Sequence, residues 1–201
     1  MKVRRKKTIY CRLPTPGNIA GRSSSITNAF FISIIPIHRP TAEEENEALE
    51  ILGMKGDDIR CVYCGDKSTE WDHLRPLIKH KEPTGFITEI ANLVPACGKC
   101  NQSKGNKDWD KWIMSDALLS PKTRGKDGGE RISRLRKYEL WKTPIKFDFA
   151  AIVEPELWAK HKANWQRVLD LLTESQVIAK EIHVAIERHA RSVKTGNAPP
   201  D

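Results

Sequence analysis

Two pairs of cysteines are the residues whose types and spacing most clearly predict chemistry. Two residues separate Cys61 from Cys64 and Cys97 from Cys100, and 32 residues lie between the pairs. A Cys-x-x-Cys turn lets two thiolates reach one tetrahedral Zn²⁺ at about 2.3 Å, so two such turns complete a four-thiolate shell. A closed shell of this kind is structural. The alternative, a thioredoxin-like redox pair, needs one motif rather than two.

A second candidate centre lies between these pairs, where Asp72 and His73 stand side by side in the run WDHLRPL. Asn101 directly follows the last cysteine. Zinc bound by both cysteine pairs would therefore fix both ends of the segment between them. It would hold the Asp72 carboxylate, the His73 imidazole and the Asn101 carboxamide in register. The carboxylate and carboxamide oxygens suit Mg²⁺ or Mn²⁺, and a neutral imidazole can take a proton from water. Adjacent strand residues face opposite ways, so a twist, a bulge or a strand end is expected here if both serve one phosphate.

The ordered set CVYCG, WDHLRPL and ANLVPACGKCNQSKGN resembles the HNH nucleases of the ββα-metal superfamily, in the subgroup braced by a four-cysteine zinc. The resemblance covers about residues 59–113. It implies that His73 is the general base and that Asp72 and Asn101 bind the catalytic cation, Mg²⁺ or alternatively Mn²⁺. It also implies that Asn92 holds the loop between the strands through backbone hydrogen bonds. At the third position of the HNH signature this chain has Asn101 instead of His. This is an accepted variant, in which the side chain supplies an oxygen as the metal ligand.

These features predict a metal-dependent HNH endodeoxyribonuclease, which is a phosphodiester hydrolase. The resemblance implies 5′-phosphate and 3′-hydroxyl ends, and the chain looks like a sequence-specific type II restriction enzyme acting on double-stranded DNA. Similar cores occur in homing, phage-packaging and nonspecific nucleases. The alternative from another class is a non-catalytic, zinc-braced nucleic-acid-binding module. Such a module needs only the cysteines and a basic surface, and has no need of Asp72, His73 and Asn101 together.

The formal net charge of +8 favours a polyanionic partner, because neutralising phosphates releases condensed counterions. Arg75 and Lys104 are candidate DNA contacts, although Lys104 is equally suited to solvating its helix. The N-terminal arm supplies further candidates, which are Lys2, Arg4, Arg5, Lys6 and Lys7.

The chain has no run of 18 apolar residues and no recognisable signal peptide, so no membrane partner is expected. Five cysteines, an odd number, argue against a disulfide framework, and Cys11 has no partner in either motif. Together these observations predict a cytoplasmic protein.

The expected fold class is α+β, with a small ββα-metal core braced by the zinc and flanked by helices at both ends. Strands are predicted within 68–79 and 85–96 around a turn-prone segment, 80–85, and helical spacing begins after Cys97. The expected divisions are a basic arm (1–24), a helical segment (25–56), the HNH core (57–115), a basic loop-rich segment (116–154) and a C-terminal helical segment (155–201).

Outside the core, Thr41 is predicted to cap a short helix that Gly53 ends. Trp109 and Trp112 follow the helical period and are interpreted as core anchors. Two amphipathic helices are expected at 155–173 and 175–191. Their apolar residues exceed what two helices need to cover each other. This surplus predicts a homodimer, and packing against segment 25–52 is an equally physical use of the same surface.

Overall fold

The computed structural model describes residues 14–126 and 128–194, which fall into two compact units. One unit contains residues 27–163. The other contains the described parts of 1–26 and 164–201. Helices α1 (Ser23–Ile32) and α7 (Pro155–Lys194) each cross from one unit into the other.

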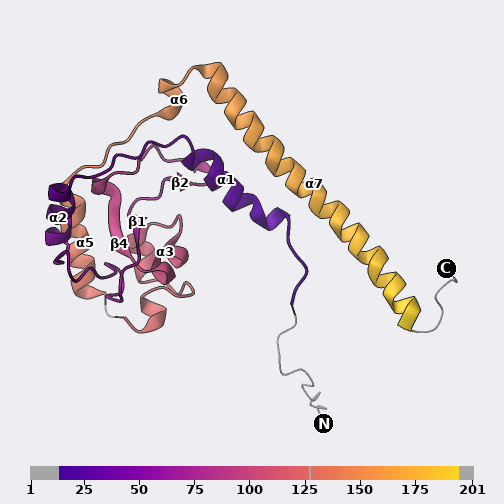
Figure 1. Cartoon of the computed structure of the whole chain (residues 1–201), viewed down its shortest axis with the longest axis horizontal. Coiled ribbons are helices and arrows are strands. Elements are labelled where there is room, and N and C mark those ends of the chain that lie inside the picture. Colours follow the sequence, from indigo (N-terminus) through magenta and orange to yellow (C-terminus); the bar gives the residue numbers. More distant parts are fainter. Residues whose placement is uncertain (1–13, 127, 195–201) are drawn as a thin grey trace, which may run out of the picture. The chain divides into compact units, whose positions relative to one another are not determined.

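The larger unit is built around two antiparallel strands followed by a helix (Figure 1). Strand β1 (Glu70–His73) pairs with β4 (Leu93–Ala96), with Asp72 opposite Val94 and His73 opposite Leu93. Helix α3 (Gly98–Lys104) begins directly after Cys97, its N-cap residue. This ββα arrangement within a mixed structure confirms the predicted α+β class.

A second pair of short strands occupies the connection between β1 and β4. Strand β2 (Ile78–Lys79), at the end of the predicted strand region 68–79, pairs antiparallel with β3 (Glu82–Pro83), which lies inside the segment 80–85 that was predicted to be a turn. His80 and Lys81 form the two-residue loop, and both have positive φ, at 53° and 65°. Two consecutive left-handed residues are the geometry of a type I′ hairpin. The turn was thus predicted, but β3 was not, because the sequence lacks the usual Asn-Gly signal of a two-residue hairpin.

Helices on the flanks of the ββα core support it. Helix α2 (Ala42–Ile51) begins at Thr41 with a capping box formed with Glu44, which confirms the predicted cap. It packs against α5 (Gly129–Trp141), a 13-residue helix within the segment 116–154. The remaining short elements are α4 (Trp109–Ile113), α6 (Phe149–Ile152) and the 3-10 turns η1 (Ala20–Arg22), η2 (Ile90–Asn92) and η3 (Lys122–Arg124).

The hydrophobic core joins these flanking helices to the strands. Trp109 and Trp112 are both buried within it, as predicted. The Tyr138 hydroxyl of α5 donates hydrogen bonds to the carbonyls of Ile90 and Leu93, the latter at 2.7 Å. Helix α5 therefore supports the start of β4, which in turn pairs with the strand that carries Asp72 and His73. Other large core residues are Leu52, Tyr63, Leu74, Val94, Ile113 and Leu135.

The C-terminal region corrects one prediction, because α7 is a single helix of 40 residues and not two. The expected break lay at Thr173–Ser175, where hydroxyl residues favour a cap. The Thr173 hydroxyl instead donates to the Leu169 carbonyl at 3.0 Å, one turn back, and no Gly or Pro interrupts the segment. No helix in the described part of the chain has the length and apolar character needed to cross a membrane.

Candidate active site and metal centre

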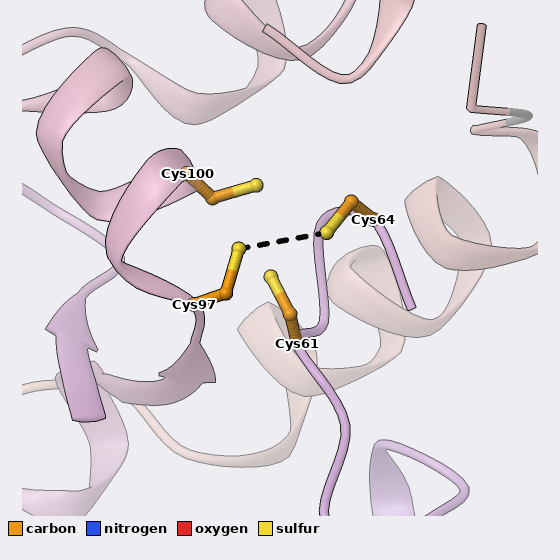
Figure 2. Close-up of side chains that lie close together, drawn as sticks. All are labelled: Cys61, Cys64, Cys97 and Cys100. Carbon is orange, nitrogen blue, oxygen red and sulfur yellow. Dashed lines mark hydrogen bonds between the residues drawn. The ribbon is translucent and has the colours of Figure 1, made fainter. Parts of the chain in front are cut away.

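The four cysteines of the two Cys-x-x-Cys motifs meet in one buried cluster (Figure 2). All four Sγ atoms lie within 4.8 Å of one another, and those of Cys64 and Cys97 are 3.7 Å apart. A tetrahedral zinc with bonds of about 2.3 Å places its sulfurs about 3.8 Å apart. The cluster therefore fits one zinc ion with no open position, as the spacing predicted.

Local backbone structure brings the two motifs together. The Gly65 amide donates to the Cys61 carbonyl at 2.8 Å, which closes the first turn, and Gly65 has a φ of 76° that favours glycine. The Val62 amide donates to the Pro95 carbonyl at 2.9 Å and ties this turn to β4. Because Cys97 follows β4 and Cys100 lies in the first turn of α3, the same strand delivers the second motif to the first.

The thiols strongly perturb one another. Hydrogen bonds to Cys61 and Cys64, together with burial, raise the pKa of Cys100, while hydrogen bonds from Cys100 and Cys61 lower the pKa of Cys64. Adjacent thiolates repel each other, so the cluster does not ionise fully by itself. A bound dication offsets that repulsion, which is the electrostatic reason such clusters bind zinc.

Arg124, which sequence reasoning missed, contributes a positive charge to the cluster. Its Nη2 donates to Cys100 Sγ at 2.7 Å, and its Nη1 lies 3.3 Å from Asp66 Oδ2. Burial disfavours the guanidinium, but the charges of Cys100 and Cys64 outweigh this effect, and the pKa of Arg124 is raised. No spacing rule links Arg124 to the cysteines, because it lies 24 residues beyond Cys100 in a separate 3-10 turn.

Asp72 lies in the interior, between a phenol and an ammonium group. The Tyr63 hydroxyl donates to Asp72 Oδ2 at 2.7 Å, and Lys104 Nζ lies 3.0 Å from the same oxygen and 3.3 Å from Oδ1. Only 5% of Asp72 is exposed. Burial raises the pKa of Asp72 and outweighs the opposing effects of Lys104 and Tyr63. The carboxylate is therefore held in a defined position with its charge compensated.

His73, the last residue of β1, contacts a different part of the molecule. Its Nε2 lies 2.8 Å from Thr88 Oγ1, in the loop before η2. Burial, and then the nearby charge of Lys104, lower the pKa of His73 to about 4. The ring is consequently neutral at neutral pH, which is the state that a proton acceptor requires. Strand β1 ends at His73, which is one of the three features expected at this point.

Asn92 joins the beginning and the end of the connection between β1 and β4. Its Oδ1 accepts from the Arg75 amide at 2.8 Å, and its Nδ2 donates to the Arg75 carbonyl at 3.1 Å. The side chain is fully buried. These are backbone hydrogen bonds of the kind that the resemblance implies for this position.

Helix α3 carries Asn101 and Lys104 three residues apart, so their side chains share one side of the helix. Asn101 is partly exposed, whereas Lys104 has no exposed surface. The prediction that Lys104 contacts phosphate or solvates its helix needs correction. Its Nζ binds Asp72 and donates to the His73 carbonyl at 2.7 Å, because a buried ammonium requires an anionic or carbonyl partner.

The other candidate DNA contacts differ in their surroundings. Arg75 Nη2 lies 3.5 Å from Glu139 Oε1, and its guanidinium lies 6.0 Å from the ring centre of Phe86. Its charge is therefore already partly compensated. The arm cations Lys2, Arg4, Arg5, Lys6 and Lys7, like Cys11, lie outside the described residues.

Residues 61–107 match the family model of the HNH endonuclease. The resemblance of this segment to the HNH family is thereby confirmed. The CRISPR-associated endonuclease Cas9 of Corynebacterium diphtheriae (strain ATCC 700971 / NCTC 13129 / Biotype gravis) is 25% identical to this chain over 141 residues. These residues cover 67% of this chain and 12% of that protein. The similarity is longer than the HNH segment and so includes flanking residues. No solved structure matches the chain.

The HNH segment, residues 61–107, offers oxygen donors on two neighbouring elements. Asp72 supplies a carboxylate from β1, and Asn101 supplies a carboxamide from α3. Such hard donors suit Mg²⁺, which retains most of its waters and binds phosphate oxygens. The Asp72 carboxylate already binds one positive charge, the Lys104 ammonium. The two oxygen donors fit a hard divalent cation in their chemistry, and a bound ion would share the Asp72 carboxylate with the Lys104 ammonium.

Proposed function

We propose that this chain is a metal-dependent DNA endonuclease in which His73 is the general base. One observation carries the proposal: β1 ends with the partly buried imidazole of His73, which follows the buried Asp72 in sequence, on a ββα core that carries the four-cysteine cluster. The HNH match supports the same activity, as does a relative whose description names an endonuclease. A structural zinc module alone would not require this imidazole and carboxylate.

The proposed reaction divides the work among the residues of the HNH segment. His73 accepts a proton from the attacking water, since its imidazole is neutral. Asp72 and Asn101 would hold Mg²⁺, with Mn²⁺ as the alternative, and the bound ion would neutralise charge on the scissile phosphate. Tyr63 and Lys104 fix the Asp72 carboxylate, and Asn92 fixes the loop that follows His73. Cys61, Cys64, Cys97 and Cys100 would hold zinc, which would keep β4 and α3 attached to the first cysteine turn.

We propose double-stranded DNA as the substrate, cleaved to 5′-phosphate and 3′-hydroxyl ends in the manner of a type II restriction enzyme. The net charge of +8 supports a DNA partner. The proposed phosphate contacts are Arg75 and the arm cations, which give affinity and salt dependence without reading sequence. A restriction role places the protein in the cytoplasm, where the DNA to be cut is found.

The decisive experiment incubates purified protein with supercoiled and phage DNA in Mg²⁺, in EDTA, and with the His73→Ala variant. We expect cleavage in Mg²⁺ only, and a loss of about two to four orders of magnitude for His73→Ala with DNA binding and zinc content unchanged. Discrete bands support sequence specificity, and a smear indicates a nonspecific nuclease. DNA binding without any cleavage would favour the non-catalytic zinc module.

A further inference from the structure

The contact between His73 and Thr88 has no role in the mechanism derived above. Thr88 Oγ1 lies 2.8 Å from His73 Nε2, and both residues are partly buried. Thr88 belongs to the loop that precedes η2, fifteen residues beyond His73. The hydroxyl therefore reaches the imidazole from an element other than its own strand, and fixes one of the two ring nitrogens.

The backbone of Thr88 is itself anchored by the segment before α2. The Thr88 amide donates to the Pro36 carbonyl at 3.1 Å, and the Thr88 carbonyl accepts from the His38 amide at 2.8 Å. Ile37 and Thr88 thus form a parallel bridge. Because both main-chain groups of Thr88 are bonded, its side chain starts from a fixed point, as a group that orients another residue requires.

The segment after α5 anchors the same loop at two further points. The Glu89 carboxylate accepts a hydrogen bond from the Ile145 amide, and the Phe147 amide donates to the Gly85 carbonyl at 2.9 Å. Gly85 has a φ of 91°, and a Cβ there would lie 2.2 Å from the Phe147 carbonyl oxygen. Only glycine allows this close approach. Two segments from outside the HNH segment therefore hold the loop that carries Thr88.

A neutral imidazole has one N–H and one lone pair, so the partner of Nε2 decides what Nδ1 can do. If Thr88 donates its proton to Nε2, Nδ1 carries the hydrogen and the ring cannot accept a proton from water there. If Thr88 accepts from Nε2–H, the Nδ1 lone pair is free. Only the second arrangement is compatible with His73 as the base, because Thr88 occupies the Nε2 side.

We propose that Thr88 is a positioning residue for His73: its hydroxyl accepts a hydrogen bond from Nε2–H and holds the tautomer whose Nδ1 receives the proton of the attacking water. The inference rests on the proposed nuclease function. In the reaction the water O–H bond breaks, Nδ1 gains the proton, the hydroxide oxygen bonds to phosphorus, and the bond to the 3′-oxygen breaks. The 3′-oxygen takes a proton from solvent, and the imidazolium later releases its proton to solvent. Thr88 keeps its hydrogen bond throughout and touches no reacting atom.

Three variants of the full-length, zinc-loaded chain test this role. Thr88→Val removes the hydroxyl at constant shape, and Thr88→Ser restores it. Thr84→Val is the matched control, because the Thr84 hydroxyl also belongs to this connection but donates to the Pro76 and Leu77 carbonyls, at 2.7 and 3.1 Å. Each variant is first checked for zinc content and for a cooperative unfolding transition.

The first readout is the tautomer of His73, measured by nitrogen-15 NMR and assigned by the signal that His73→Gln lacks. We expect the Nε2–H form in the wild type, in Thr88→Ser and in Thr84→Val, and a mixture of tautomers in Thr88→Val. An Nδ1–H form in the wild type would overturn the proposal. So would an unchanged tautomer in Thr88→Val. This measurement needs no DNA, so it stands or falls separately from the nuclease activity.

The second readout is the single-turnover rate of DNA cleavage, with DNA affinity measured in parallel. We expect Thr88→Val to cut on the order of a hundredfold more slowly at unchanged affinity, because a base in the wrong geometry loses about that factor. Thr88→Ser should recover most of the rate. Equal losses in Thr88→Val and Thr84→Val would show that the hydroxyl only supports the loop. If the wild type did not cut at all, the proposed function would fail whatever the tautomer result.

Discussion

Lys104 Nζ lies 3.0 Å from Asp72 Oδ2, and neither side chain has more than 6% of its surface exposed. This ion pair joins the end of α3 to β1, the two elements that carry the proposed cation ligands. Lys104 also donates to the His73 carbonyl, so one ammonium holds both of the neighbouring residues that define the proposed centre. The buried Lys104 cation is thus part of the scaffold of the proposed centre.

Removing this ammonium should destabilise the fold. Lys104→Met leaves the Asp72 carboxylate buried without its cation, which costs about 3–5 kcal/mol in the free energy of unfolding for a broken buried pair. Lys99→Met is the control, since Lys99 is an exposed residue of the same helix and should change stability by less than about 0.5 kcal/mol. Urea unfolding of both variants makes the comparison. Equal stabilities would contradict the role assigned to the pair.

The depressed pKa of His73 predicts a specific pH dependence of stability. The pKa is about 4 in the folded chain and about 6.5 when unfolded. Between these values the unfolded chain binds more protons, so the free energy of unfolding falls as the pH is lowered from 6.5 to 4, by about 3 kcal/mol in all. Above pH 6.5 both states are neutral and this contribution is constant.

His73→Gln isolates this contribution, because other carboxylates also titrate in acid. Its free energy of unfolding should fall less steeply than that of the wild type between pH 6.5 and 4, and the two curves should run parallel from pH 7 to 8. Denaturant unfolding at several pH values measures both. Parallel curves over the whole range would mean that His73 is not protected from protonation by the fold.

Local patterns predicted much of this architecture. The cap at Thr41 and the cysteine cluster follow from residues that lie a few positions apart, or from a spacing that one metal ion imposes. Strand β4 follows from a short apolar run, Leu93–Ala96. In each case the chemistry that stabilises the element is visible within a short stretch of sequence.

Contacts between distant residues could not be predicted in this way. Lys104 resembled a phosphate contact because its motif shows a basic residue near a helix end, and nothing in the sequence reveals that Asp72, 32 positions earlier, compensates its charge. Arg124 and Thr88 are similar cases. Each acts through a partner brought close only by the tertiary fold, so hydrophobic periodicity and motif spacing carry no signal for them.

Arg124 should control how firmly zinc is held. Because its guanidinium donates to Cys100 Sγ at 2.7 Å, Arg124→Met removes a charge that stabilises the thiolate, and we expect zinc affinity to fall about 10- to 100-fold. Cys64→Ser sets the upper limit for the loss of zinc affinity, since removing a ligand should release zinc and unfold the middle of the chain. Chelator competition measures the affinities.

The control for Arg124 comes from the same 3-10 turn. Lys122 pairs at the surface with Asp116, 2.8 Å away, rather than with a cysteine, so Lys122→Met should retain wild-type zinc affinity. If Arg124→Met and Lys122→Met released zinc equally, a general effect of net charge would explain the result. If the wild-type chain bound less than about one zinc, the four-cysteine site itself would be refuted.

The last prediction concerns assembly through α7. One HNH centre cuts one strand, so double-strand cleavage at a symmetric site is most simply achieved by a two-fold dimer. Ile178, Ile182 and Ile186 lie four residues apart on one face of α7, and about half or more of each is exposed. We propose that this face contributes to the dimer contact, as burial of such apolar surface drives association.

Point substitutions test this contact more cleanly than truncation at Glu154, which would also remove His161 and its contact with the Phe30 carbonyl at 3.1 Å. We expect Ile182→Asp combined with Ile186→Asp to yield monomers by light scattering, and to reduce double-strand cutting more than nicking, because each monomer retains its own centre.

The matched control is Val177→Asp with Val184→Asp, two residues of similar exposure on a different face of the helix. A wild-type chain that remained monomeric on DNA while still linearising plasmid would contradict the dimer. Equal dissociation by both pairs of substitutions would contradict the chosen face, because charge anywhere on α7 would then suffice.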